Sequence, residues 1–193
     1  MEAFLISTGV VALAEIGDKT QLLALVLAAR FRKPLPIVLG ILVATLANHA
    51  MAGAAGAWIS ALLGPAAMRW ILGLSFIGMA AWTLIPDKLD DEDDGQAPKR
   101  QPRFGVFGTT LIAFFLLEMG DKTQIATVAL AARYTSLAGV VAGTTLGMMF
   151  ANVPAVLLGD VAAKKLPMQL VHRIAAAIFL ALGVTVLVGY GGV

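Results

Sequence analysis

One seven-residue sequence occurs twice in this chain, each time in the middle of a long apolar run. Residues 15–21 read Glu-Ile-Gly-Asp-Lys-Thr-Gln, and residues 118–124 read Glu-Met-Gly-Asp-Lys-Thr-Gln. A charged side chain at the centre of a bilayer costs about 2.5–3.5 kcal/mol even on the mildest scale. We expect a chain that places two matching sets of such residues there to use them. The ionisable residues of the two motifs are Glu15, Asp18, Lys19, Glu118, Asp121 and Lys122.

The composition predicts an integral membrane protein. Of the 193 residues, 59% are hydrophobic and 13% are charged, whereas about 25% of the residues of a soluble domain are charged. The chain has no cysteine, which excludes a disulfide framework and a thiolate metal site. Its two histidines are too few for a histidine-rich metal cage.

Six apolar runs are long enough to cross a bilayer, which takes roughly 20 helical residues. They cover about residues 4–29, 36–62, 68–86, 105–132, 136–159 and 170–190, and prolines or basic residues mark most of their ends. The sequence therefore predicts an all-α membrane protein with six transmembrane helices. The long polar segment at residues 87–103, rich in acidic residues, is expected to be a solvated linker.

The two halves of the chain align beyond the motif. Arg30 matches Arg133 and Gly40 matches Gly143 at the same offset as the motifs. Three crossings per half bring the chain to the opposite side of the membrane, so the second half must insert upside down, as in many secondary transporters. We predict a repeat at residues 1–86, a linker at 87–103 and an inverted repeat at 104–193, with the two motifs facing each other near the midplane.

The basic residues predict the orientation. Ten lie on the side of the linker, and Arg69 and Arg133 lie on the other side. The positive-inside rule then places the acidic linker in the cytoplasm and both termini outside, in what we expect to be a bacterial inner membrane.

The motif offers oxygen ligands to a cation. On one helix, a Glu and an Asp three residues apart share a face, and each lysine can pair with the glutamate four residues before it. The two threonines point elsewhere on an ideal helix. Gly17 and Gly120 weaken the helix, and a break there would free backbone carbonyls. The predicted ligands are Glu15, Asp18, Glu118, Asp121, Gln21, Gln124, Asn48 and Asn152.

The charges of the two motifs indicate what they bind. Four carboxylates against two ammonium groups leave a charge of −2, which a divalent cation would neutralise. Hard oxygen ligands favour Ca²⁺, Mg²⁺ or Mn²⁺ over zinc or copper. A carboxylate binds a metal ion when ionised and a proton when the metal leaves, which is the physical basis for metal–proton exchange.

Several alternatives stay open at this point. The charges could serve only to hold the bundle together, and Asn48 and Asn152 could serve only in helix–helix hydrogen bonds. His49 could be a proton relay or a structural residue. A proton-coupled exporter of a small organic solute, such as an amino acid, would use Lys19 and Lys122 for substrate carboxylates. A metal-dependent hydrolase usually needs histidine ligands, and the sequence has no histidine near either motif.

The duplicated motif resembles that of a family of small six-helix cation transporters. The pattern Glu-x-Gly-Asp-Lys/Arg-Thr/Ser, once per half, is found in Golgi manganese/calcium–proton exchangers, chloroplast manganese transporters and bacterial manganese exporters. The resemblance implies that the Glu and Asp of each copy bind the cation and that protons are exchanged for it. It implies a transporter rather than an enzyme, with Mn²⁺ or Ca²⁺ as substrate, no cofactor and no nucleic-acid partner. The matching motif positions around the acids are Gly17, Lys19, Thr20, Gly120, Lys122 and Thr123.

Overall fold

The computed structural model describes residues 1–85, 104–158 and 168–189, and all regular structure in these ranges is helical. The expectation of an all-helical chain is therefore confirmed for this part of the chain. The predicted linker at 87–103 lies outside the described residues. The helices are α1 (Glu2–Glu15), α2 (Lys19–Phe31), α3 (Pro34–Leu62), α4 (Pro65–Thr83), α5 (Gly105–Glu118), α6 (Lys122–Arg133), α7 (Leu137–Leu158) and α9 (Met168–Leu187).

Two of the six expected spans are each divided into two helices. The run at 4–29 forms α1 and α2, and the run at 105–132 forms α5 and α6, with the division inside the motif in both cases. Four of the described helices contain a stretch that is long and apolar enough to cross a membrane: Pro34–Leu62, Ala66–Thr83, Leu137–Leu158 and Gln169–Leu187.

Local sequence accounts for several helix ends. Pro34 and Pro65 lie in the first turns of α3 and α4. Proline is tolerated there because a backbone N–H at this position would have no hydrogen-bond acceptor within the helix. Arg32 ends α2 in the left-handed conformation with φ 50°, and its N–H bonds to the carbonyl of Ala28. This left-handed cap is an accepted way to satisfy a last carbonyl of a helix.

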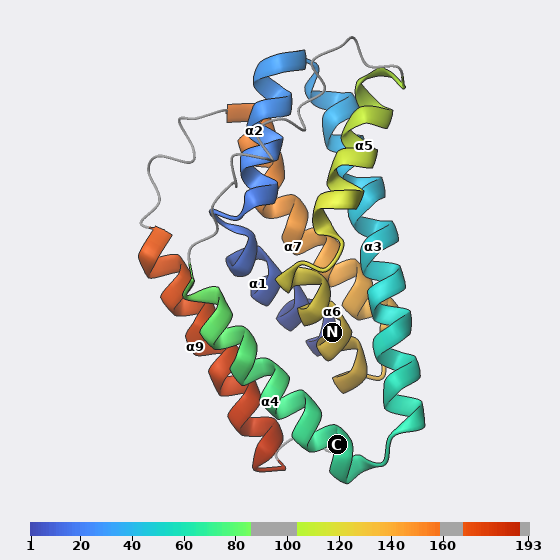
Figure 1. Ribbon diagram of the computed structural model, residues 1–193, viewed down its shortest axis with the longest axis vertical. Coiled ribbons are helices and arrows are strands. Elements are labelled where there is room, and N and C mark those ends of the chain that lie inside the picture. Colours follow the sequence, from blue (N-terminus) through green and yellow to red (C-terminus); the bar gives the residue numbers. More distant parts are fainter. Residues whose placement is uncertain (86–103, 159–167, 190–193) are drawn as a thin grey trace.

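The two divided segments run in opposite directions (Figure 1). The chain rises through α1 and α2 and descends through α5 and α6, and the two interruptions lie near the middle of the molecule. Helix α3 packs against α5, α6 and α7, while α7 packs against α1 and α2. Helices α4 and α9 lie along each other and contact α6 and α1, respectively.

Glycines at matching positions of the two halves allow matching pairs of helices to pack closely. A Cβ added to Gly40 of α3 would lie 2.9 Å from the carbonyl oxygen of Phe107 in α5, and one added to Gly143 of α7 would lie 2.5 Å from that of Phe4 in α1. Phe4 and Phe107 occupy matching positions in the two halves. The helix backbones approach so closely because small residues remove the steric barrier, which is the usual basis of helix packing in membranes.

The apolar core is divided into two clusters. One contains buried residues of α1, α4, α6 and α9 and Val140 of α7, including the stacked rings of Phe76 and Phe179. The other contains residues of α2, α3, α5 and α7, with Phe114 and Leu27 among them. The chain breaks and their charged residues join the elements of one cluster to those of the other, so the polar site has apolar packing on both sides.

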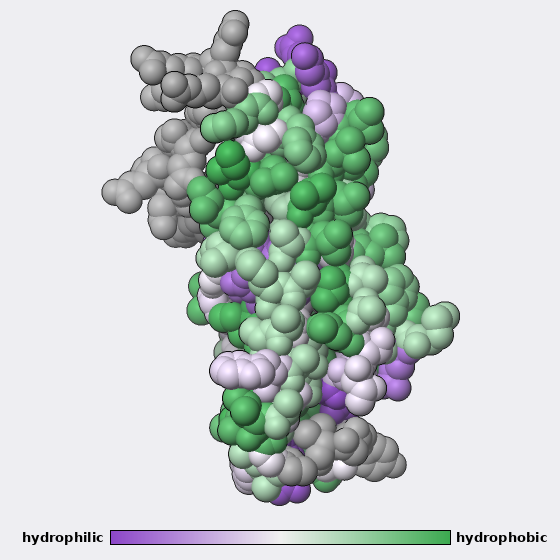
Figure 2. Space-filling view, turned by 90° about the vertical axis from the view of Figure 1, so that its right-hand side faces the viewer, coloured by the Kyte–Doolittle hydropathy of each residue, from purple (hydrophilic) through white to green (hydrophobic). Residues whose placement is uncertain are grey.

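The outer surface is apolar over the middle of the molecule (Figure 2). Hydrophobic side chains cover most of this face, with hydrophilic residues gathered toward its upper and lower ends. Large apolar side chains exposed on several helices include Leu39, Val43, Leu46, Trp58, Leu74, Phe150, Leu157 and Leu180. A surface of this kind suits hydrocarbon rather than water, because exposed apolar patches on soluble monomers are normally limited in size.

Candidate metal centre

Each motif interrupts its helix at a glycine. Gly17 has φ 85° and Gly120 has φ 78°, a left-handed conformation that glycine adopts without the steric cost other residues meet. The preceding residues, Ile16 and Met119, are extended. Asp18 then occupies the N-cap of α2, as Asp121 does for α6. The predicted break is therefore confirmed in both halves.

Two glutamines brace the breaks. The Oε1 atom of Gln21 accepts a hydrogen bond from the N–H of Gly17 at 2.9 Å, and that of Gln124 accepts one from Gly120 at 2.8 Å. The Nε2 group of Gln21 also donates to the carbonyl of Ala151 in α7 at 2.9 Å. These amide oxygens are thus engaged with the backbone of their own motif, and a metal-binding role for them stays a prediction.

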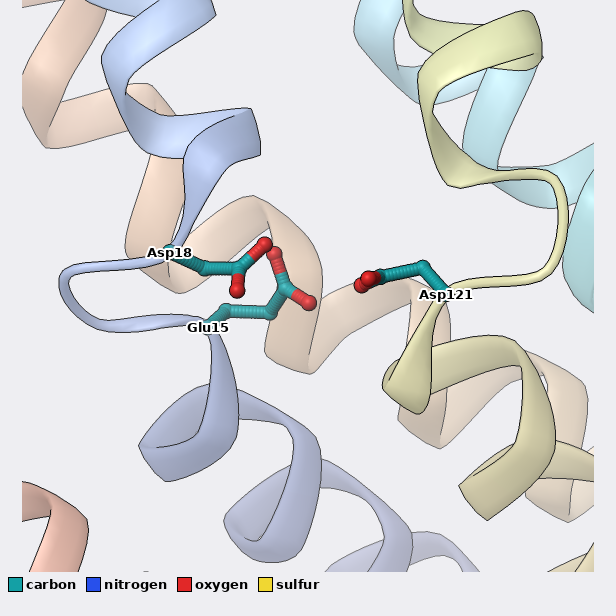
Figure 3. A group of neighbouring side chains, drawn as sticks. All are labelled: Glu15, Asp18 and Asp121. Carbon is teal, nitrogen blue, oxygen red and sulfur yellow. The ribbon is translucent and has the colours of Figure 1, made fainter. Parts of the chain in front are cut away.

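Three carboxylates from the two motifs converge (Figure 3). Glu15, Asp18 and Asp121 are all buried, and one oxygen of each lies within 4.8 Å of the others. The side chain of Asp121 reaches toward the other two from the opposite break. The structure therefore brings the two motifs together in the interior, as the sequence predicts.

Both motif threonines donate hydrogen bonds to Glu15. The Oγ1 hydroxyl of Thr20 donates to Oε2 of Glu15 at 2.5 Å, and that of Thr123 donates to Oε1. The expectation that these threonines point away from the acids is wrong. It assumed a continuous helix, whereas the break folds Thr20 back toward Glu15 and the opposing motif supplies Thr123.

The lysine of each motif pairs with the aspartate of the other motif. Nζ of Lys19 lies 3.1 Å from Oδ1 of Asp121, and Nζ of Lys122 lies 3.1 Å from Oδ1 of Asp18. Helical spacing within one motif does not predict this reciprocal pairing, because it depends on the two breaks facing each other. Lys122 and Asp18 are almost fully buried, while Lys19 is 26% exposed.

The fourth acid has a different neighbour. Glu118 is buried on the last turn of α5, and its Oε1 lies 3.4 Å from Nε2 of His49 on α3. No histidine lies near a motif in the sequence, but the fold brings His49 to Glu118. Sequence distance hid the contact, since His49 and Glu118 meet only when α3 packs against α5.

The two asparagines donate hydrogen bonds through their side-chain amide nitrogens. Nδ2 of Asn48 donates to the carbonyl of Phe115 at 3.1 Å, and Nδ2 of Asn152 donates to that of Met148 at 3.1 Å. Their Oδ1 atoms are buried and have no hydrogen-bond partner among the described residues. The helix–helix bond expected of Asn48 is present, and binding of a cation by either oxygen stays a prediction.

The arrangement suits a hard divalent cation. Three buried carboxylates converge with two ammonium groups beside them, and the fourth acid of the motifs, Glu118, is buried as well, which leaves an acid excess when all are ionised. Carboxylate, hydroxyl and amide oxygens are the ligands that Ca²⁺, Mg²⁺ and Mn²⁺ prefer. Burial removes competing water, so charge interactions there are stronger than at a surface.

A family model describes most of the chain. The model of "Divalent cation/proton antiporter GDT1" matches residues 3–91 and 106–191. Together with the long apolar helices, this match identifies the chain as an integral membrane protein. No solved structure matches it.

Related proteins come from bacteria and plants. A Vibrio cholerae protein named "Putative manganese exporter" is 51% identical over 181 residues, covering 93% of this chain and 88% of the relative. A GDT1-like protein of Synechocystis is 28% identical, with 93% of each chain covered. GDT1-like protein 3 of rice is 26% identical over 95% of this chain and 73% of its own.

Proposed function

Since the chain belongs to the GDT1 family of divalent cation/proton antiporters, we propose that it exports Mn²⁺ from the cytoplasm in exchange for protons. The observation that carries this proposal is the meeting of Glu15, Asp18 and Asp121 from two motifs in one buried cluster. Such a cluster can hold a divalent ion when ionised and protons when the ion leaves. Mn²⁺ is the favoured substrate because the relative at 51% identity carries manganese in its name, and Ca²⁺ is the other candidate.

The architecture in this proposal is six membrane spans in two inverted repeats, residues 1–86 and 104–193. Each divided pair, α1–α2 and α5–α6, then counts as one discontinuous span. The opposed directions of the two pairs in Figure 1, the reciprocal lysine–aspartate pairs and the matching glycine contacts of α3 and α7 support this reading. Discontinuous helices meeting near the midplane are a common plan in secondary transporters.

Alternating access follows from this plan. The site lies between two halves, so rocking one half against the other exposes it to each side in turn. The distribution of basic residues puts the linker in the cytoplasm and both termini outside. Export against a negative-inside potential costs about 2.3 kcal/mol per charge per 100 mV, and inward protons offset that cost.

Export of an organic solute is the weaker alternative. It assigns Lys19 and Lys122 to the carboxylates of the substrate, but each ammonium group lies 3.1 Å from an aspartate of the protein. A solute would have to displace both pairs, whereas a cation needs only the acids.

Flux measurements in proteoliposomes test the proposal. Purified protein is reconstituted, a pH gradient is imposed, and Mn²⁺ and Ca²⁺ movement is followed with and without the gradient. We expect gradient-driven Mn²⁺ flux that Asp18→Asn or Asp121→Asn abolishes while the variants elute from size exclusion as the wild type does. Undiminished flux in the variant with both substitutions would show that the motif is structural, and flux indifferent to the pH gradient would refute proton exchange.

A further inference from the structure

The two motif glutamates occupy different environments, although they hold matching positions in the repeat. Each carboxylate oxygen of Glu15 accepts a threonine hydroxyl. Glu118 has one contact at hydrogen-bond distance, from Oε1 to Nε2 of His49, and its Oε2 has no hydrogen-bond partner among the described residues. Glu118 is therefore the motif glutamate whose Oε2 is available to bind an ion.

The imidazole of His49 contacts Glu118, the motif glutamate outside the group of three converging carboxylates. The ring is fully buried, and its Nδ1 has no hydrogen-bond partner in the described part of the chain. The polar contact that the structure gives the ring is thus a carboxylate of the site. Glu118 precedes Asp121 by three residues in the same motif, and the backbone N–H of Asp121 donates to the backbone carbonyl oxygen of Glu118 at 3.1 Å.

The spacing of the two side chains suits shared binding of an ion. Nε2 of His49 and Oε1 of Glu118 are 3.4 Å apart. Donor atoms that bind one metal ion at about 2.0–2.2 Å and at roughly right angles lie about 3 Å from each other. A small change in this distance therefore allows both atoms to bind one ion. The position that matches His49 by the alignment of Asn48 with Asn152 is Val153, so this nitrogen donor belongs to one half alone.

We propose that His49 is a specificity-determining residue, which with Glu118 gives the transport site a nitrogen ligand that selects first-row transition-metal ions over Ca²⁺ and Mg²⁺. Ca²⁺ and Mg²⁺ bind through oxygen, whereas imidazole binds transition metals, with affinity rising from Mn²⁺ toward later members of the series. An all-oxygen site would not make this distinction by ligand type. The inference rests on the proposed cation transport and narrows its substrate class to Mn²⁺ and similar ions.

Electron spin-echo measurements on Mn²⁺-loaded protein test the ligand directly. We expect wild-type protein in detergent to show the modulation of a directly bound imidazole nitrogen, His49→Gln to lose it, and His172→Gln to keep it. His172 is the matched control because it is the second histidine of the chain, and its Nε2 contacts the backbone carbonyl of Ile16 instead of a carboxylate. Bound Mn²⁺ with no nitrogen modulation in the wild type would overturn the inference without need of any variant.

Competition flux in proteoliposomes provides the second readout. Glutamine keeps an N–H donor for Glu118 but is not a nitrogen ligand, so His49→Gln separates positioning from coordination. We expect the apparent affinity for Mn²⁺ relative to Ca²⁺ to fall at least tenfold in His49→Gln and to stay unchanged in His172→Gln. An unchanged ratio in His49→Gln would contradict the inference. Absence of Mn²⁺ binding and flux in the wild type would instead contradict the proposed function, so the two failures are distinguishable.

Discussion

The ammonium group of Lys122 lies 3.1 Å from Oδ1 of Asp18, a residue of the other half of the chain. Lys19 and Asp121 repeat the relationship in reverse at the same distance. The two pairs differ in burial, since Lys122 is 1% exposed and Lys19 is 26% exposed. Breaking a buried pair by removing one partner typically costs about 3–5 kcal/mol, because the remaining charge stays buried.

We predict that Lys122→Met destabilises the protein more than Lys19→Met. Lys122→Met removes the ammonium group of Lys122 from beside Asp18, which is fully buried. In Lys19→Met, water at the partly exposed edge of the Lys19–Asp121 pair screens the charge that remains on Asp121. Thermal unfolding in detergent, followed by tryptophan fluorescence, measures both. The double variant Lys122→Met with Asp18→Asn should recover part of the loss, and equal midpoints for the two single variants would show that burial of the pairs does not matter.

We predict that Gly120→Ala impairs transport through backbone conformation alone. A Cβ at this position would have no atom within 4 Å, yet the residue has φ 78°, where an L-residue costs roughly 1–2 kcal/mol. The matched control is Gly9→Ala in α1, which also has no atom within 4 Å and should be neutral or stabilising by up to about 1 kcal/mol. Mn²⁺ flux and thermal midpoints check both, and equal behaviour of the two variants would count against the strained break.

We predict that Thr20→Val and Thr123→Val weaken Mn²⁺ binding. Valine keeps the shape of threonine but removes a hydroxyl donor to Glu15, and hydrogen bonds to charged groups contribute about 1.5–3 kcal/mol. The apparent affinity should therefore fall about tenfold or more. Thr127→Val is the control, because its hydroxyl donates to the backbone of Thr123. Isothermal titration measures all three, and a loss of similar size in Thr127→Val would indicate a general packing effect.

We predict that Gly40→Ala and Gly143→Ala both destabilise the bundle, by about 1–3 kcal/mol each. Their added methyl groups would meet backbone carbonyl oxygens at 2.9 and 2.5 Å, and backbone cannot move aside as a side chain can. Gly78→Ala on α4, with nothing within 4 Å, is the comparison. Thermal unfolding should separate the first two variants from the third, and three superimposable curves would argue against close helix contact at these glycines.

The sequence predicts the helices well and the site in part. Apolar runs and prolines locate most helix ends, and the repeated acids indicate where two halves meet. The breaks at Gly17 and Gly120 are also foreseeable, because glycine beside charged residues is a poor helix former. What the sequence cannot supply is which side chain meets which across the interface.

Apart from the bond between Thr20 and Glu15 within one motif, the contacts that escaped prediction join residues far apart in the chain. Thr123 reaches Glu15, Lys122 reaches Asp18, and His49 reaches Glu118. Helical spacing gives neighbours within one segment, and it fails once the segment is interrupted. Only the packing of α3 against α5, and of one break against the other, determines these partners.

The reciprocal lysine–aspartate pairs have a consequence for opening of the protein without a bound cation. In the proposed alternating access, parting the two halves at this level separates each aspartate from the lysine of the other motif while the site is still buried. A doubly charged ion, or protons, can then neutralise the aspartates, whereas a protein that carries neither leaves their charge uncompensated. Under the proposed mechanism, the same pairs that hold the halves together therefore oppose opening of a protein that carries neither a metal ion nor protons.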